Sequence, residues 1–244
     1  MTVAVTALGT LLASLSACGT DMSGSARAGG ALGPRGPAVR SPAVSALPEI
    51  DPARLPGIGD RLHRQIPADS GQVLAVYGED RDSADSTAVL YTKEGPEWRP
   101  VARWAAHNGR NGWTEDHHSG DNRSPIGVFG LSDAGGVLDD PGSMLPYDQN
   151  RYAYAPTVDD AAYDHVFDYV IAIDYNRLPG TPPHDPTRPE GDDKGGGIWL
   201  HLDHGDGTSA CVSLPEEAME FLLRTLDPTR HPVTVMGDRA ELSA

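Results

Sequence analysis

Short segments of β-forming residues, each bounded by turn residues, restrict the fold of this chain more than any other feature. Apart from one stretch after Cys211, no part of the sequence shows a sustained helical period. The sequence therefore predicts a mainly β fold, a β-sandwich or partly closed barrel with one or two flanking helices. Seven segments rich in Val, Ile, Tyr, Trp or Thr are the predicted strands: 72–77, 87–92, 98–106, 127–131, 169–175, 198–203 and 232–237.

Two long irregular stretches interrupt this pattern, at 132–165 and 178–197, and both are rich in Pro, Gly, Asp and Tyr. Loops of that length inside a compact domain are usually functional or mobile. The second lies directly before a predicted strand that carries His201. We therefore expect residues 178–197 to form a lid or a mobile wall of a binding groove.

The N-terminal residues read as an export signal. Residues 1–17 carry no Asp, Glu, Lys or Arg and are largely apolar, which predicts a signal peptide. The sequence Leu15-Ser16-Ala17-Cys18 resembles the lipobox of bacterial lipoproteins, in which the cysteine is lipidated. Residues 18–50 are rich in Gly, Ala, Ser, Pro and Arg and fit a flexible tether. We expect an exported protein of the cell envelope, anchored through Cys18 to the lipid bilayer at the outer face of the cytoplasmic membrane.

The charge and the cysteine content narrow the functions further. The formal net charge is −16, which argues against nucleic acid and anionic membrane surfaces as partners. Of the two cysteines, Cys18 is taken by lipid in this interpretation, so no disulfide can form within the mature chain. A single remaining thiol outside the cell is a liability unless it has a role, which favours a functional Cys211.

His201 is the first candidate partner for that thiol. Ile198, Leu200 and Leu202 alternate with polar or aromatic residues, so His201 points away from the aliphatic face of its strand. Gly205-Asp206-Gly207 is a turn signal, and a hairpin about Asp206 would place His201 opposite Cys211. Opposed residues have Cβ atoms roughly 5 Å apart, within reach of a contact between thiol and imidazole.

The residues after Cys211 predict a helix. Ser213 and Glu216 have capping-box spacing, and Pro215 suits a first turn. A helix N-terminus and a neighbouring imidazolium would lower the pKa of the thiol below about 8.5 and supply N–H groups for an oxyanion. The alternative is a small buried cysteine with a hydrogen-bonded histidine beside it. The apolar face of the predicted helix consists of Ala218, Met219, Leu222, Leu223 and Leu226.

Several blocks of sequence, in order, resemble one known family. Trp104 to Trp113 contains Gly-Arg-Asn-Gly, and Gly120 to Phe129 reads Gly-Asp-Asn-Arg-Ser-Pro-Ile-Gly-Val-Phe. Tyr175-Asn176, the block ending at His201, and Thr208 to Leu214 follow. Together these blocks resemble the L,D-transpeptidase (YkuD-like) catalytic domain over roughly residues 72–237. We therefore predict a lead-in at 51–71 and a catalytic domain at 72–238.

The resemblance implies a β-rich cysteine enzyme that acts on peptidoglycan stem peptides without a cofactor. Cys211 would attack a stem carbonyl and release the terminal D-alanine, with His201 as general base. Water or an amine of a second stem would then take the acyl group, which leaves carboxypeptidase and transpeptidase activity both open. Backbone N–H groups of Ala210 and Cys211 would hold the oxyanion. The family's blocks place the following residues in the substrate groove: Arg123, Ser124, Tyr175, Asn176 and Ser209.

Two other functions compete with this one. A metal-dependent hydrolase could use His201, Asp203 and His204, although on a strand the two histidines should point to opposite faces, and we predict no metal site. A non-catalytic wall-binding lipoprotein with the same fold is the other alternative. It is favoured by Ala210, which stands where the family has glycine and would be strained if that position needs a positive φ.

Overall fold

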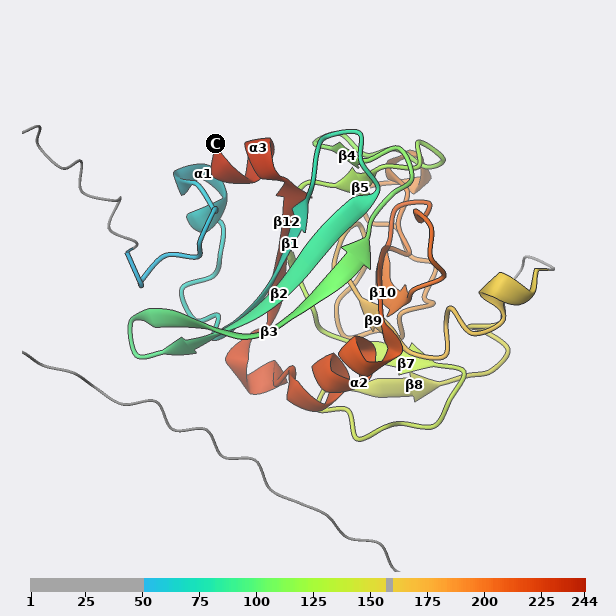
Figure 1. Cartoon of the computed structure of the whole chain (residues 1–244). Coiled ribbons are helices and arrows are strands. Elements are labelled where there is room, and N and C mark those ends of the chain that lie inside the picture. The colour runs from blue at the N-terminus through green and yellow to red at the C-terminus, as the bar shows by residue number, and fades with distance from the viewer. Residues whose placement is uncertain (1–50, 157–159) are drawn as a thin grey trace, which may run out of the picture. The chain divides into compact units, whose positions relative to one another are not determined.

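The computed structural model describes residues 51–156 and 160–244, and β-strands form most of it (Figure 1). The predicted signal peptide and tether lie outside the described residues. The strands are β1 Gln72–Gly78, β2 Asp85–Glu94, β3 Glu97–His107, β4 Trp113–Thr114, β5 Ser124–Pro125, β6 Gly127–Gly130, β7 Ala134–Gly136, β8 Tyr147–Gln149, β9 Val170–Ala172, β10 Trp199–Leu202, β11 Val212–Leu214 and β12 Val233–Asp238. The helices are α1 Asp60–His63, α2 Glu216–Thr225 and α3 Arg239–Ser243, with 3₁₀ turns η1 Ala161–Tyr163, η2 Asp192–Lys194 and η3 Pro228–Arg230.

Ten of these strands form one mixed sheet in the order β6-β12-β1-β2-β3-β11-β10-β9-β7-β8, and β4 pairs with β5 separately. All seven predicted segments contain one of these strands, so the prediction of a mainly β fold is confirmed. The prediction missed the shortest strands, which lie in loops or next to Cys211. Within the sheet, β3 and β11 are joined through one residue pair, His107 and Ser213. This pair links two halves of five strands each.

The two halves of the sheet share one hydrophobic core. Leu74 and Leu90 from β1 and β2 belong to the same buried cluster as Leu200 and Leu214 from β10 and β11. Helix α2 adds Leu222, which is fully buried. One continuous sheet therefore bends so that its two halves enclose a common core, as the prediction of a sandwich or partly closed barrel requires.

A second cluster covers the opposite face of β1 and β2. It contains Leu55 and Leu62 from the lead-in and Leu242 from α3. The predicted lead-in at 51–71 contains α1, which lies beside α3 in Figure 1. Gly59 N donates to Leu242 O at 2.7 Å. Among the described residues, none of the helices has the length and apolarity needed to span a bilayer.

The predicted hairpin about Asp206 is wrong. Strands β10 and β11 run parallel, with Leu200 beside Val212 and His201 beside Ser213. The turn does not reverse the chain within the sheet because Thr208 is bonded elsewhere. Its N–H donates to Asn108 O at 2.9 Å, and its carbonyl accepts from Arg110 N at 2.8 Å. These bonds hold the loop against the end of β3, and the chain returns to enter β11 from the same end as β10.

The start of the predicted helix is also wrong, although its apolar face is confirmed. Helix α2 begins at Glu216 after Pro215, without a side-chain cap, and Ser213 instead lies in β11, where its hydroxyl donates to Asp203 at 2.7 Å. Strand β11 therefore separates Cys211 from the helix N-terminus. The predicted apolar face is fully buried: Ala218, Met219, Leu222, Leu223 and Leu226.

Helix α2 should contribute strongly to stability through this face. We expect Leu222→Ala to lower the free energy of unfolding by about 2–5 kcal/mol, because a fully buried leucine leaves a cavity on truncation. Glu217→Ala, at an exposed position of the same helix, should change it by less than about 0.5 kcal/mol. Urea unfolding of both variants measures this, and equal losses would mean that α2 is not part of the shared core.

Candidate active site

Cys211 lies just before β11 and is partly exposed. Continuing the parallel register by one residue places it beside Trp199. The backbone N–H of Trp199 donates to the sulfur at 3.4 Å, and the sulfur lies 3.8 Å from the carbonyl oxygen of Gly197. The thiol therefore rests against the start of β10, and it is the free thiol of the described chain.

His201 and Cys211 share one face of the sheet. His201 is in register with Ser213, and neighbours in register on parallel strands point to the same side. Cys211 precedes Ser213 by two residues and so points to that side as well. From strand spacing and rise, the Cα atoms of His201 and Cys211 are about 8 Å apart on the diagonal, a distance that a thiol and an imidazole can bridge.

The His201 ring is fixed in one tautomer. Its Nδ1 lies 2.8 Å from the carbonyl oxygen of Leu202. Because a carbonyl oxygen only accepts hydrogen bonds, Nδ1 carries the proton, and Nε2 is left with a lone pair. Phe167 contacts the ring edge-on at 5.3 Å, and the His204 ring stacks at 6.0 Å. Burial among these rings lowers the pKa of His201 to about 4, so the imidazole is a neutral base at physiological pH.

The thiol is also neutral at rest. Burial raises the pKa of Cys211 to about 11, and the hydrogen bond from Trp199 N–H only partly offsets this. The sequence-based prediction of a lowered thiol pKa is therefore wrong, for two reasons. The helix N-terminus lies beyond β11, and the neighbouring imidazole is uncharged, so neither of the expected positive charges acts on the sulfur.

A buried hydroxyl orders the backbone around Cys211. Ser124, in β5, has no exposed surface. Its Oγ accepts from Gly109 N at 2.9 Å and donates to the carbonyl oxygens of Ala210 at 2.7 Å and Cys211 at 3.2 Å. The hydroxyl of Thr208 also donates to Cys211 O, at 2.7 Å. Two successive carbonyls are thus directed toward β5 and the 208 turn.

This arrangement sets the direction of the Cys211 N–H. In a planar trans peptide the carbonyl and the next N–H point in opposite directions, so the Ala210 carbonyl on Ser124 turns the Cys211 N–H away from β5. Within the described chain, no backbone or side-chain acceptor is bonded to the amide of Ala210 or Cys211. Both amides are therefore free to bind an oxyanion, and the predicted oxyanion role itself stays a prediction. Ala210 does not have a positive φ, so alanine is unstrained at this position.

The other residues predicted to line the groove form hydrogen bonds or ion pairs within the protein to different extents. Arg123 forms an ion pair with Asp82 at 2.7 Å and also donates to Trp113 O at 3.1 Å. Tyr175 donates through its hydroxyl to His117 O at 3.2 Å. Ser209 is exposed and has no side-chain hydrogen bond within the described residues. Ser209 has the freest side chain of this group, and contact of any of these residues with a substrate remains a prediction.

Asn176 has a clear structural role. It is buried, and its backbone is left-handed with a φ of 44°, which asparagine tolerates better than most residues. Its amide donates to the carbonyls of Gly191 at 2.9 Å and Gly195 at 2.6 Å, and its side-chain oxygen accepts from Glu190 N at 2.7 Å. Asn176 therefore holds the far end of the 178–197 loop.

Further bonds hold the same loop at its start and at its middle. Arg177 is buried and pairs with Asp133 at 2.9 Å and with Asp174, and it donates to Thr181 O at 2.6 Å. The indole N–H of Trp199 donates to Pro183 O at 3.2 Å. These bonds contradict the expectation of a mobile lid. The loop is a fixed wall beside Trp199 and Cys211.

The sequence analysis did not predict a row of polar side chains next to Cys211 and His201. His107, Ser213 and His201 are in register across β3, β11 and β10. Asp203 accepts from Ser213 at 2.7 Å and bonds to His107 Nδ1 at 2.7 Å. Burial raises the pKa of Asp203, but these two hydrogen bonds outweigh it and lower that pKa overall. The alternation of Asp203 with His201 along one strand was the available signal.

The arrangement does not favour a metal centre. Among residues 51–156 and 160–244, no three His, Cys, Asp or Glu side chains are placed to hold a metal ion. We predicted that His201 and His204 would point to opposite faces of the strand. Instead their rings stack, with 9° between the ring planes. Asp203 turns away from both toward His107 and Ser213.

Comparison with known proteins identifies the family. The model of the L,D-transpeptidase catalytic domain (YkuD) matches residues 82–235, more than half of the chain. The chain belongs to this family. The matched region contains His201, Cys211 and the Ser124 block, which are the residues that carried the resemblance in the sequence.

Two solved structures are similar to this YkuD-family chain, at low identity. The helical cell shape determining protein Pgp2 from Campylobacter jejuni is 15% identical, with 72% of this chain and 51% of that chain covered and a TM-score of 0.43. Bd1075 from Bdellovibrio bacteriovorus is 16% identical, with 68% and 47% covered and a TM-score of 0.38. The chain thus spans about half the length of each. No curated protein matches the chain.

The buried neutral state of His201 predicts a pH dependence of stability. Its pKa is lower in the folded protein, at about 4, than the usual 6.5, so the unfolded state binds more protons between these values. Stability should therefore fall as pH drops from 6.5 to 4, by up to about 3 kcal/mol from this residue. His201→Asn should remove that part of the dependence in urea unfolding measured across this pH range.

A matched control is His231→Asn, because His231 is exposed and has a left-handed φ of 48° that asparagine accepts. This variant should keep the wild-type dependence on pH. Parallel curves for wild type and His201→Asn would contradict the buried neutral imidazole.

Proposed function

We propose that this protein is a cysteine-dependent peptidoglycan L,D-transpeptidase or carboxypeptidase that acts through an acyl-enzyme on Cys211. One observation carries the proposal. The free thiol of Cys211 lies on the same sheet face as His201, whose Nε2 carries no proton. The thiol is next to the amides of Ala210 and Cys211, which are bonded to no acceptor among the described residues. Membership of the YkuD family supports the choice of peptidoglycan stem peptides as substrate.

In the first half-reaction the thiol proton moves to Nε2 of His201 as the sulfur attacks a stem carbonyl. Since thiol and imidazole are both neutral at rest, the ion pair forms only as the S–C bond forms. The oxyanion of the tetrahedral intermediate accepts a hydrogen bond from the Cys211 N–H. The hydrogen bond from Ser124 to the Ala210 carbonyl sets the direction of this N–H. Collapse breaks the C–N bond, and the imidazolium returns its proton to the departing D-alanine amine.

In the second half-reaction a nucleophile cleaves the thioester. Its proton passes to His201, the C–S bond breaks, and the thiol is restored. An amine of a second stem gives a cross-link, and water gives a shortened stem. Both outcomes share one acyl-enzyme, so product analysis distinguishes them.

The non-catalytic alternative has lost its main support. It rested on Ala210 in place of glycine, and Ala210 has no positive φ that would strain it. The metal-dependent alternative lacks a converging ligand set among the described residues.

Acylation by a carbapenem tests the proposal, because these compounds acylate members of the family. Intact-protein mass should show one adduct, located on Cys211, and Cys211→Ala should show none. His201→Ala should keep the thiol but slow acylation by about 10²-fold or more, the usual scale for losing a positioned base. The control His231→Asn, at an exposed position, should react at the wild-type rate. A folded wild-type protein with no adduct on Cys211 would sink the proposal.

We also propose that the protein is an exported lipoprotein anchored through Cys18. The support is the sequence Leu15-Ser16-Ala17-Cys18, the uncharged residues before it, and the Gly-, Ser- and Pro-rich tether after it. A tethered enzyme could reach a thick external substrate while it stays attached to the membrane.

Membrane fractionation with mass analysis tests the anchor. The native protein should fractionate with membranes and carry a diacylglycerol-type increment on Cys18. Cys18→Ala should leave the chain unprocessed or release it from the membrane. Unmodified Cys18 in a cytosolic fraction would rule out both the anchor and the export.

A further inference from the structure

A cavity of about 330 Å³ lies on the face of β1 and β2 that the lead-in and α3 cover. This volume is at the lower end of the range for small-molecule sites. Its floor is mainly apolar, and the floor hydroxyl of Tyr77 is already bonded to Pro56 O at 2.7 Å and lies 3.4 Å from the Tyr91 hydroxyl. The principal lining residues are Pro56, Tyr77, Val89, Tyr91, Arg103 and Arg239.

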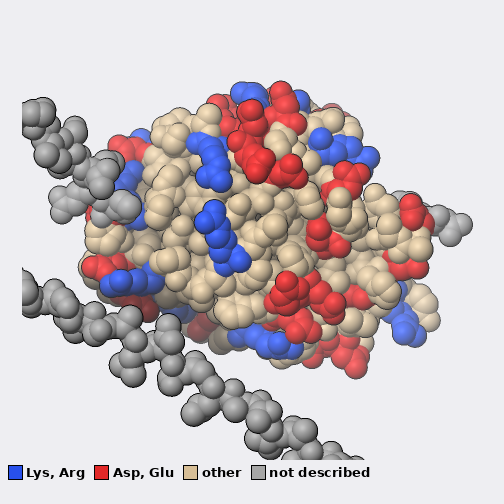
Figure 2. All heavy atoms as spheres, in the orientation of Figure 1, with Lys and Arg blue, Asp and Glu red and all other residues tan. Residues whose placement is uncertain are grey.

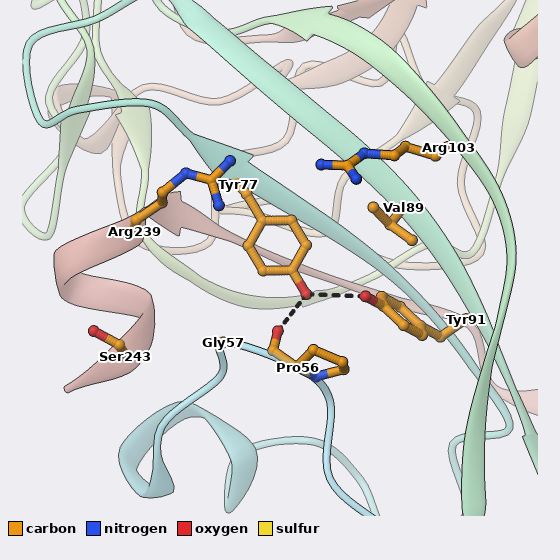
Figure 3. A pocket seen from close by; sticks show the side chains of 8 residues that line it. All are labelled: Pro56, Gly57, Tyr77, Val89, Tyr91, Arg103, Arg239 and Ser243. Atoms are coloured by element: carbon orange, nitrogen blue, oxygen red, sulfur yellow. Dashed lines mark hydrogen bonds between the residues drawn. The ribbon is translucent and has the colours of Figure 1, made fainter. Parts of the chain in front are cut away.

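Two guanidinium groups converge on this cavity. Figure 3 shows Arg103 from β3 and Arg239 from α3 on either side of the Tyr77 ring, with their charged ends directed toward each other. The Arg239 guanidinium lies 5.9 Å from the centre of that ring. Two elements far apart in the sequence therefore place two positive charges over one apolar floor.

Neither arginine has an anionic partner within the described residues. Arg61, Arg123 and Arg177, by contrast, each pair with a carboxylate. Three other arginines without a carboxylate partner in the described chain donate to backbone carbonyls instead: Arg110, Arg188 and Arg230. The chain has a net charge of −16, and Figure 2 shows acidic side chains gathered in patches on the face that it draws. Carboxylates are abundant, yet two neighbouring cations are left unpaired. Both side chains are exposed, so water screens much of their mutual repulsion, and an anion bound between them would attract both.

We propose that this cavity binds a small ligand that joins an oxyanion, a carboxylate or a phosphate, to an apolar or aromatic group. The oxyanion accepts hydrogen bonds from both Arg103 and Arg239, whose planar forks match its geometry. The apolar group packs on Tyr77, Val89 and Tyr91. No bond is made or broken, and the site is separate from Cys211, so the proposal does not rest on the proposed function.

Isothermal titration calorimetry with benzoate and with phenyl phosphate tests the site, with benzamide as the neutral counterpart. At least one of the anions should bind at least tenfold more tightly than benzamide, and the tighter one identifies the preferred oxyanion. Arg103→Gln and Arg239→Gln should each weaken that binding by about tenfold, the scale of a lost charge-assisted hydrogen bond. Arg99→Gln, on the same strand as Arg103 and paired with Glu97, should leave it unchanged.

Two further variants keep the outcome clear. Cys211→Ala should bind the anion as the wild type does, so a failure of the proposed chemistry would not affect this result. If a glutamine variant unfolds, Arg103→Lys keeps the charge but loses the fork, and it should bind more weakly than wild type. The proposal would be overturned if neither anion binds, if the Arg103→Gln and Arg239→Gln variants both bind with wild-type affinity, or if inorganic phosphate and phenyl phosphate bind equally tightly.

Discussion

The geometry of the candidate site depends on the hydrogen bonds of the Ser124 hydroxyl. This hydroxyl is completely buried and bonds three backbone groups, the N–H of Gly109 and the carbonyls of Ala210 and Cys211. Loss of this hydroxyl would leave the buried N–H of Gly109 unsatisfied and remove the bond that orients the Ala210 carbonyl, whereas the Cys211 carbonyl would keep its bond from Thr208. The direction of the Cys211 amide, and with it the position of any oxyanion, follows from this one side chain. Ser124 therefore shapes the candidate site through the backbone that it holds.

Desolvation defines the protonation states of the candidate pair, Cys211 and His201. Cys211 and His201 lie in surroundings that disfavour their charged forms, so both are neutral near pH 7. The bond from His201 Nδ1 to Leu202 O fixes the tautomer with its lone pair on Nε2. A neutral pair of this kind does not keep a standing thiolate, which also limits oxidation of the thiol.

The 178–197 loop, which forms one wall of the candidate site, is held in place by bonds that its composition does not predict. Residues 178–197 are rich in Pro and Gly, which usually indicates a mobile loop. Here Asn176 and Arg177, placed directly before the loop, bond to its backbone at both ends. Together with the bond from Trp199 to Pro183 O, these bonds hold the loop from residues outside it, which its own composition does not reveal.

The sequence alone determined seven of the strands and the buried face of α2, because side-chain alternation and helical period are local properties. Its ordered motif blocks also singled out Cys211 and His201 as the candidate pair. Residues such as Leu200 and Leu222 could be assigned to the core from period alone. Only the tertiary structure decided that β10 and β11 run parallel, because bonds from Thr208 to the end of β3 redirect a turn that reads as a hairpin. It also decided the pKa values of Cys211 and His201, since desolvation is set by Phe167, His204 and other neighbours that chain order does not reveal.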